Sequence, residues 1–243
     1  MRLIYFFYGV LCYVMFLGVF LYTIGFVGNF GVPKTMDSGQ VISWYLALPI
    51  NLALLSLFAL QHSVMARQGF KKWLTSLIPT AIERSTYVLA TNIALIVLIW
   101  QWRPMNIIIW DISDSSIAPL IWAICAFGWF TVLISTFLID HFELFGLKQV
   151  YSYLKGTEMK SSGFRTPLFY KRVRHPIYFG FAVAFWATPI MTVAHLVFAI
   201  GATGYSIVGA LLEERDLISN FGDRYREYRE KVPMLVPGLK RKT

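Results

Sequence analysis

The chain has 243 residues, of which 57% are hydrophobic and only 14% charged, and its formal net charge is +9. Soluble domains carry about 25% charged residues, so this deficit excludes an ordinary water-exposed surface and favours a lipid-facing one. The two cysteines, Cys12 and Cys125, lie in apolar runs and suggest neither a disulfide framework nor a metal motif.

Six apolar stretches approach the length of about 20 residues that a helix needs to cross a bilayer. They cover residues 3–27, 44–66, 85–102, 118–139, 176–193 and 196–212. The last two are short and are separated only by residues 191–195, which predicts a tight hairpin. Residues 104–116 are expected to form a simple outer loop. The sequence therefore predicts an all-α, polytopic bundle of five to six transmembrane helices in a single integral membrane domain, residues 1–243.

Lys and Arg residues fix the expected orientation, because cytoplasmic loops carry the excess of positive charge. With a cytoplasmic N-terminus and six crossings, only Lys34 and Arg103 fall on the outer side, and every other Lys and Arg falls on the inner side. The basic excess is therefore interpreted mainly as a topology signal, with anionic membrane lipids as secondary partners. Nucleic acid is not expected to bind.

Nearly all residues capable of chemistry fall at the inner ends of the predicted helices. They are His62; Glu83, Arg84 and Tyr87; Asp140, His141 and Glu143; Arg174, His175 and Tyr178; and Glu213, Glu214, Arg215 and Asp216. Ionisable residues within membrane segments are costly and indicate function by default. For each residue alone, anchoring of a helix end is an equally good explanation. The one-sided distribution of the whole set favours function, whereas His195, at the outer turn, is interpreted as structural.

Residues 174–180, Arg-His-Pro-Ile-Tyr-Phe-Gly, form the most informative stretch. Pro176 disfavours helix at the preceding residue and suits the first helical position, so a helix is predicted to begin here. Its free backbone N–H groups form an anion site beside Arg174 and His175. Gly180 would let another helix or a ligand approach closely.

A second pattern begins with Glu213-Glu214 and ends at residues 232–237, Val-Pro-Met-Leu-Val-Pro. Between them, one apolar stripe at helical spacing lies opposite a densely charged face: Leu217, Phe221, Tyr225, Tyr228 and Val232. This stripe predicts an amphipathic helix that lies at the inner interface and folds back over the site. A stripe by itself more often reflects plain packing.

Together, the two patterns resemble the family of membrane methyltransferases that includes isoprenylcysteine carboxyl methyltransferase and bacterial phospholipid methyltransferases. The resemblance rests on the Arg-His-Pro-x-Tyr-x-Gly motif, the Glu-Glu pair and the Tyr/Val-Pro tail. Further segments, which touch every span except the first, are similar to the bacterial methanethiol S-methyltransferases: residues 61–67, 83–87, 141–150, 164–170 and 185–192.

The resemblance implies an S-adenosylmethionine-dependent thiol S-methyltransferase of the bacterial inner membrane, with its active site facing the cytoplasm. The implied reaction converts methanethiol to dimethyl sulfide, and hydrogen sulfide is a second acceptor to be considered. Residues 140–237 are the expected cofactor-binding portion.

The cofactor's methionine part carries a carboxylate, an amine and a sulfonium, which need different partners. Arg174 and His175 are candidates for the carboxylate, and the Glu-Glu pair for the amine. Glu213 is preferred because it lies one turn before Leu217 on the inward stripe. The predicted cofactor-binding residues are therefore Arg174, His175, Tyr178, Gly180, Glu213, Glu214 and Tyr225.

A thiol acceptor also requires a base, because the thiolate is the nucleophile. His62 and His141 are the leading candidates, with Asp140 or Glu143 as an orienting partner, and the residues do not decide between them. No His-x-x-x-His or cysteine spacing supports a metal site.

Two rival functions remain open. One keeps the cofactor and changes the acceptor to a prenyl-cysteine carboxylate or a phospholipid amine. The other is a non-enzymatic membrane protein, either a transporter or an assembly factor. Transporters usually place polar groups at the midplane or on both sides, which this sequence does not.

Overall fold

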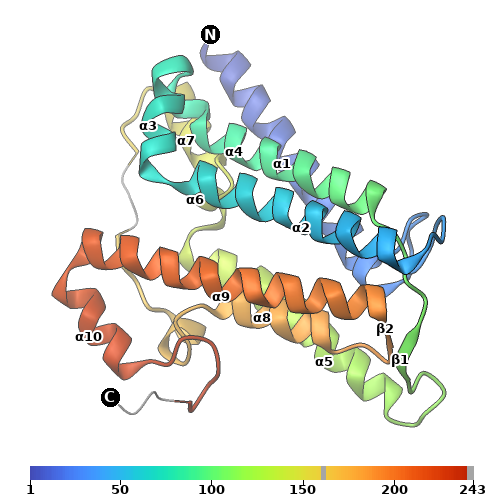
Figure 1. Cartoon of the computed structure of the whole chain (residues 1–243). Coiled ribbons are helices and arrows are strands. Elements are labelled where there is room, and N and C mark those ends of the chain that lie inside the picture. The colour runs from blue at the N-terminus through green and yellow to red at the C-terminus, as the bar shows by residue number, and fades with distance from the viewer. Residues whose placement is uncertain (160–162, 240–243) are drawn as a thin grey trace. The chain divides into compact units, whose positions relative to one another are not determined.

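A computed structural model describes residues 1–159 and 163–239, and most of them are helical (Figure 1). The helices, in chain order, are α1 (Arg2–Gly28), α2 (Trp44–Ala66), α3 (Gln68–Leu77), α4 (Thr80–Gln101), α5 (Ala118–Ile139), α6 (His141–Leu144), α7 (Leu147–Lys155), the 3-10 turn η1 (Leu168–Lys171), α8 (Pro176–Trp186), α9 (Val193–Phe221) and α10 (Asp223–Lys231). Two strands, β1 (Ile108–Asp111) and β2 (Ile190–Thr192), form one small sheet. The predicted all-α class is confirmed.

Five helices are long and apolar enough to cross a membrane, namely α1, α2, α4, α5 and α9. Large apolar side chains on them are more than half exposed, including Phe7 and Leu11 on α1 and Phe130 and Phe137 on α5. An exposed apolar surface of this extent, on helices long enough to cross a bilayer, indicates contact with lipid. The chain is therefore an integral membrane protein.

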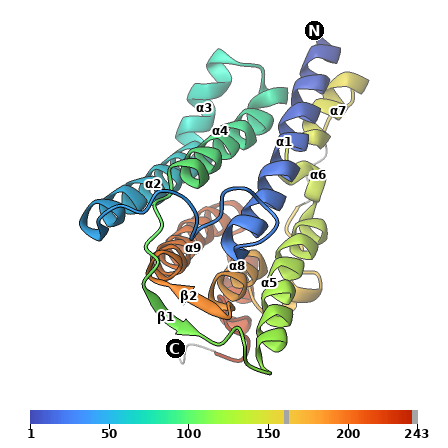
Figure 2. The same cartoon turned by 90° about the vertical axis from the view of Figure 1, so that its right-hand side faces the viewer.

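The chain divides into two compact units. The first comprises Met1–Ile107, Asp140–Ser161 and Thr192–His195, and the second comprises Ile108–Ile139, Ser162–Met191 and Leu196–Thr243. In the first unit, α1 packs against α4 and α7, and α2 packs against α4 (Figure 2). The absence of a side chain at Gly9 lets α1 approach Val150 and Ser85 closely. The predicted single domain over residues 1–243 stays a prediction.

In the second unit, α8 runs antiparallel to both α5 and α9. Gly128 and Gly180 lie against each other where α5 crosses α8, and a Cβ atom added at Gly180 would come within 2.7 Å of the Gly128 carbonyl oxygen. Small residues allow such close backbone approach between membrane helices. On the other side, Trp186 of α8 donates a hydrogen bond to Thr203 of α9. Gly180 therefore serves the helix contact, one of the two roles that its sequence position suggested.

Helix α8 is shorter than the predicted span over residues 176–193, because it ends at Trp186. Pro189 lacks a backbone donor and favours extended conformation in the preceding residue. The chain continues as β2, which pairs with β1 at the end of the unit where α5 and α9 begin. Helix α8 and the extended segment after it together run the length of the unit, although α8 is not among the five helices of the described residues that are long enough to span.

Two further predictions, both about segments expected on the outer side of the membrane, were wrong. The expected loop over residues 104–116 contains β1, whose isoleucine-rich sequence suits a strand. The expected turn at residues 191–195 lies earlier, because the Thr192 hydroxyl accepts the backbone N–H of His195 and so caps α9 at Val193. His195 is fully buried in the first turn of that helix.

The predicted amphipathic helix over residues 217–232 is divided in two. Helix α9 continues to Phe221, and Gly222 then adopts φ +56°, which breaks the helix before α10 begins. The aromatic residues of the stripe nevertheless pack against one side chain. The rings of Phe221, Tyr225 and Tyr228 all contact the ring of Phe164.

Candidate functional site

Polar residues of the second unit converge where α8 begins and α9 ends. Pro176 occupies the first turn of α8, so His175 is its N-cap residue. Helix α9 has 29 residues, a length of about 43 Å against a hydrocarbon core of about 30 Å. Its last turns, which carry Glu213 and Glu214, therefore extend beyond the hydrocarbon if the first turns begin at its edge.

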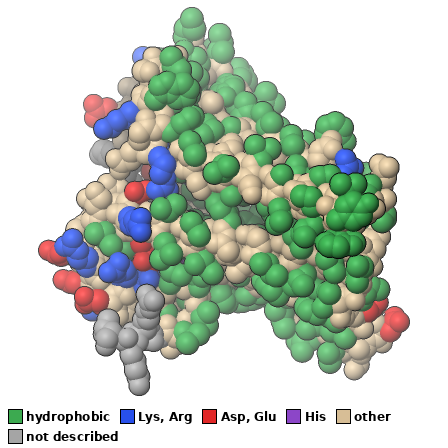
Figure 3. All heavy atoms as spheres, in the orientation of Figure 1, with side chains coloured by type: hydrophobic (Ala, Val, Ile, Leu, Met, Phe, Trp, Pro, Cys, Tyr) green, Lys and Arg blue, Asp and Glu red, His purple; other side chains and the backbone are tan. Residues whose placement is uncertain are grey.

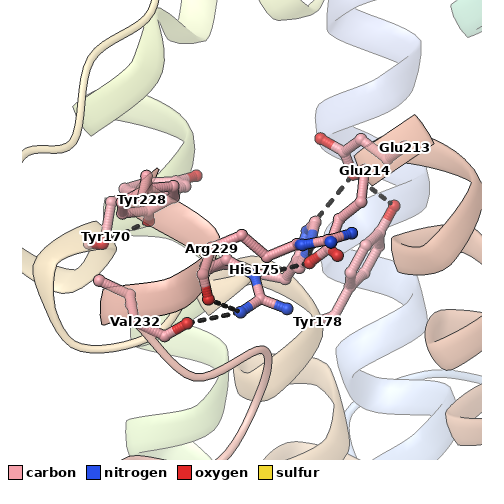
Figure 4. A network of polar contacts seen from close by, with 9 residues as sticks. Tyr170, His175, Tyr178, Glu213, Glu214, Tyr228, Arg229 and Val232 are labelled. Carbon is pink, nitrogen blue, oxygen red and sulfur yellow. Dashed lines mark hydrogen bonds and ion pairs between the residues drawn. The ribbon is translucent and has the colours of Figure 1, made fainter. Parts of the chain in front are cut away.

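Glu214 is the buried centre of this cluster (Figure 4). Its Oε1 atom accepts a hydrogen bond from Arg174 Nε at 2.6 Å and another from His175 Nε2 at 3.2 Å. The side chains of Glu214, Arg174 and His175 are 6%, 10% and 4% exposed. A buried carboxylate is tolerated only with such charged partners. The predicted residues Arg174 and Glu214 thus bind each other.

Arg174 also holds the C-terminal tail in place. Its Nη1 atom donates to the carbonyl oxygens of Arg229 and Val232, at 3.0 and 2.5 Å. The backbone N–H groups of Arg174 and His175 donate to the carbonyls of Pro233 and Met234. The Val-Pro tail of the sequence motif is therefore fixed to the start of α8 through one guanidinium and two backbone bonds.

Glu213 is the accessible carboxylate of the cluster. Its Oε2 atom accepts a hydrogen bond from the Tyr178 hydroxyl at 3.2 Å and lies 3.5 Å from His175 Nδ1. Its side chain is 49% exposed, in contrast to that of Glu214. Figure 4 shows Tyr178 and His175 both directed toward the two glutamates. Glu213 is thus held in one orientation while part of its surface remains open.

Both ring nitrogens of His175 face a carboxylate, which requires both to carry protons. Burial lowers the pKa of His175, but its hydrogen bonds to Glu213 and Glu214 and their negative charges raise it by more, so the net shift is upward. The imidazolium form is therefore favoured at this position.

Tyrosines of α10 line the same region. Burial raises the pKa of Tyr228 to about 12, and its hydroxyl donates to the carbonyl of Tyr170. Tyr225 is fully buried, and burial raises its pKa too. Its hydroxyl has no hydrogen-bond partner among the described residues. A buried hydroxyl without a partner is costly, which marks Tyr225 as a position where a bound ligand would improve the local hydrogen bonding.

In the first unit, His62 of α2 is held between two residues of α4. Its Nε2 atom lies 2.8 Å from the Tyr87 hydroxyl, and its Nδ1 atom lies 3.2 Å from Thr91 Oγ1. Thr91 donates its own proton to the Tyr87 carbonyl, so it accepts from Nδ1–H. In the neutral ring Nε2 is then the acceptor of the tyrosine proton. The guanidinium of Arg84 lies 4.9 Å from the centre of the Tyr87 ring.

His141 has a similar partner from another helix. Its Nε2 atom lies 2.8 Å from the hydroxyl of Tyr13 on α1. Burial lowers the pKa of His141, which favours the neutral ring. Tyr13 was not predicted, because the first span contains none of the segments that resemble the methyltransferases, whereas Tyr87 lies within one of them.

Asp140 and Glu143 shape the turn that carries His141. Asp140 caps α6 by accepting the backbone N–H of Glu143 at 3.0 Å, with a backbone φ of +153°. Lys148 bridges both carboxylates, at 2.5 and 2.9 Å. These acids thus fix the segment that presents the histidine.

A metal site has no support in the described part of the chain, where no group of three His, Cys, Asp or Glu residues is close enough to hold an ion.

Comparison with known proteins identifies the family. The chain is 53% identical over 236 residues to the methanethiol S-methyltransferase of Mycobacterium tuberculosis, covering 97% of each chain. It is 50% identical to the enzyme of that name from Crocosphaera subtropica, covering 97% of this chain and 92% of the relative. This chain belongs to the methanethiol S-methyltransferase family. The names of these relatives support the conclusion that this chain is a methyltransferase.

The family extends to more distant proteins. Residues 51–234 match the NnrU protein family. Nurim of Xenopus laevis is 31% identical over 175 residues, covering 69% of this chain and 61% of that protein. No solved structure matches the chain. The residues that match the NnrU family include both His62 and the cluster around Glu214.

The buried ion pair predicts a large effect of removing Arg174. In Arg174→Ala, the Glu214 charge stays buried without its guanidinium, which should lower the free energy of unfolding by about 3–5 kcal/mol. Arg226→Ala breaks an exposed pair with Asp223 and should cost less than about 1 kcal/mol. Denaturant unfolding in detergent micelles measures both, and equal losses would contradict this role of Arg174.

His175 predicts a pH dependence of stability. Its pKa is raised above the ordinary value of 6.5 by folding, so its stabilising contribution is complete below that value. The contribution is lost as pH rises through the raised, folded-state pKa. Stability of the wild type should therefore fall above neutral pH more steeply than that of His175→Gln. Parallel stability curves for the two proteins would show that the imidazolium is not stabilised.

Proposed function

We propose that this chain transfers a methyl group from S-adenosylmethionine to methanethiol, giving dimethyl sulfide, at the cytoplasmic face of a bacterial inner membrane. The observation that carries the proposal is Glu213, a half-exposed carboxylate oriented by Tyr178 and His175. The chain belongs to a family whose relatives carry the name methanethiol S-methyltransferase. Hydrogen sulfide, one methyl smaller, is a second candidate acceptor.

The residues of the cluster fit the methionine part of this cofactor. Glu213 would bind the ammonium group, since an exposed carboxylate with fixed geometry forms strong charge-assisted hydrogen bonds. Glu214 is already paired with Arg174 and His175, so its role is to hold them. The N-terminus of α8 would suit the cofactor's carboxylate, because the positive end of a helix dipole favours an anion. The unpartnered hydroxyl of Tyr225 is available for a further polar contact.

When bound, S-adenosylmethionine supplies a methyl group on a positively charged sulfur and leaves as a neutral thioether. The protein's remaining task is to remove the proton from the acceptor thiol. Opposite charges cancel as thiolate and methyl group meet, so a site with little water favours the reaction.

We assign the base role to His62, acting together with Tyr87. The Nε2 atom of His62 is the unprotonated nitrogen, and the Tyr87 hydroxyl is already hydrogen-bonded to it. The thiol proton would pass to the Tyr87 oxygen as the tyrosine proton moves to Nε2. The positive charge of Arg84 over the Tyr87 ring favours transient negative charge on that oxygen. His141 with Tyr13 is the alternative pair.

The rival acceptors make different demands. A prenyl-cysteine carboxylate is already ionised and needs no base, whereas a phospholipid amine needs room for two acyl chains. The names of the relatives favour the thiol. Specific binding of S-adenosylmethionine would exclude a transporter or an assembly factor that binds no cofactor.

The central test measures dimethyl sulfide above proteoliposomes supplied with S-adenosylmethionine and methanethiol. Glu213→Gln should raise the KM for the cofactor about tenfold or more, because a charged hydrogen bond contributes about 1.5–3 kcal/mol. Glu230→Gln makes the same change at an exposed position of α10. It is the matched control and should have little effect.

Other outcomes of this assay are equally informative. Cofactor binding without dimethyl sulfide would move the acceptor to a lipid or a prenyl cysteine. Neither binding nor product would contradict the proposal as a whole.

A series of thiols tests the base. His62→Gln and Tyr87→Phe should each lower kcat for methanethiol on the order of a hundredfold, the usual contribution of a general base. The loss should shrink with a fluorinated, more acidic thiol, which is largely ionised without help. His141→Gln and Tyr13→Phe are the matched controls. If they show the acidity-dependent loss instead, the base is the second pair.

A further inference from the structure

Beside α10, the second unit contains a basic hollow of about 270 Å³. One wall is formed by Phe164, Arg165 and Thr166, and the other by Arg224, Glu227 and Lys231. Three cations face one carboxylate, so the hollow is positively charged. In Figure 3 the charged side chains gather around α10, whereas the neighbouring surface of α9 is largely apolar.

The contacts among the residues that line the hollow leave hydrogen-bond donors of its cations available. Arg224 donates to the carbonyl oxygen of Phe164 at 3.3 Å, and its guanidinium carbon lies 5.4 Å from the centre of the Phe164 ring. Lys231 lies 4.0 Å from Glu227 in an exposed pair. Within residues 1–159 and 163–239, neither Arg165 nor the Thr166 hydroxyl has a hydrogen-bond or ion-pair partner. These donors are therefore available to an anion.

The surroundings of the hollow indicate which kind of anion it binds. Helix α10 begins two residues after the membrane helix α9 ends, which places it near the headgroup layer. Exposed apolar side chains follow both walls in the sequence: Leu168 after Thr166, and Val236 and Leu239 after Lys231. A lipid phosphate with its acyl chains would satisfy both the cations and these apolar side chains, whereas free phosphate would leave the latter in water.

We propose that the basic hollow binds the phosphate of an anionic membrane phospholipid. Arg165, Arg224, Lys231 and the Thr166 hydroxyl supply the donors, and a zwitterionic lipid is disfavoured because its ammonium group would meet the same cations. The hollow adjoins Tyr225 through Phe164, but none of its four donors is assigned to the cofactor, and lipid binding does not depend on the proposed reaction.

The test uses the full chain in nanodiscs of phosphatidylcholine with a fraction of phosphatidylglycerol. Native mass spectrometry after partial delipidation then counts the lipids retained. The wild type should retain phosphatidylglycerol in preference to phosphatidylcholine. Arg165→Gln/Lys231→Gln, which leaves the Arg224 contact to Phe164 intact, should lose on the order of fivefold in this preference per removed cation.

Controls separate this site from general surface charge and from a soluble anion site. Arg226→Gln/Arg229→Gln removes two exposed cations from the same helix outside the hollow and should keep the preference. Equal loss in both double variants would overturn the proposal in favour of diffuse charge. If millimolar inorganic phosphate displaced phosphatidylglycerol, the hollow would be a site for soluble phosphate, and the proposed lipid ligand would be wrong. Because no step requires methyl transfer, these outcomes are independent of the enzyme assay.

Discussion

The buried charge of Glu214 is the constraint on which the second unit's polar end depends. A carboxylate at 6% exposure must be neutralised, and the two groups that do so, Arg174 and His175, come from the start of the neighbouring helix. Because Arg174 also binds the carbonyls of Arg229 and Val232, the same charge fixes the tail. One desolvated carboxylate thus joins α8, α9 and the segment after α10.

This constraint divides the work between two adjacent glutamates. Glu214 is fully occupied and holds the cations in place, whereas Glu213 is oriented by Tyr178 and His175 and still half exposed. A rigid, open carboxylate is suited to bind an ammonium group without reorganisation, which is the general advantage of preorganised sites. The sequence preferred Glu213 because it lies on the apolar stripe predicted to face inward, whereas the structure buries Glu214 and leaves Glu213 half exposed. Only their packing makes Glu214 structural and Glu213 available.

The sequence predicted features that depend on local chemistry. Apolar length located the membrane helices, and Pro176 located the start of α8. Features that depend on tertiary partners were not predictable. The pairing of Arg174 with Glu214 joins residues 40 positions apart, and the hydroxyls that reach His62 and His141 come from other helices. The early end of α8 had a local signal in Pro189, but the apolar run up to residue 193 favoured a longer helix. The break at Gly222 had a local signal in the glycine itself, but the apolar stripe favoured one continuous helix.

The most direct test of the central claim is a binding cycle with S-adenosylmethionine and an analogue that lacks only the α-amino group. Equilibrium dissociation constants are measured for the wild type and for Glu213→Gln. If Glu213 binds the ammonium group, removal of the amine weakens binding by the wild type about tenfold or more but hardly affects the variant. The same loss in both proteins would show that the amine is bound elsewhere, and the assignment of Glu213 would be wrong.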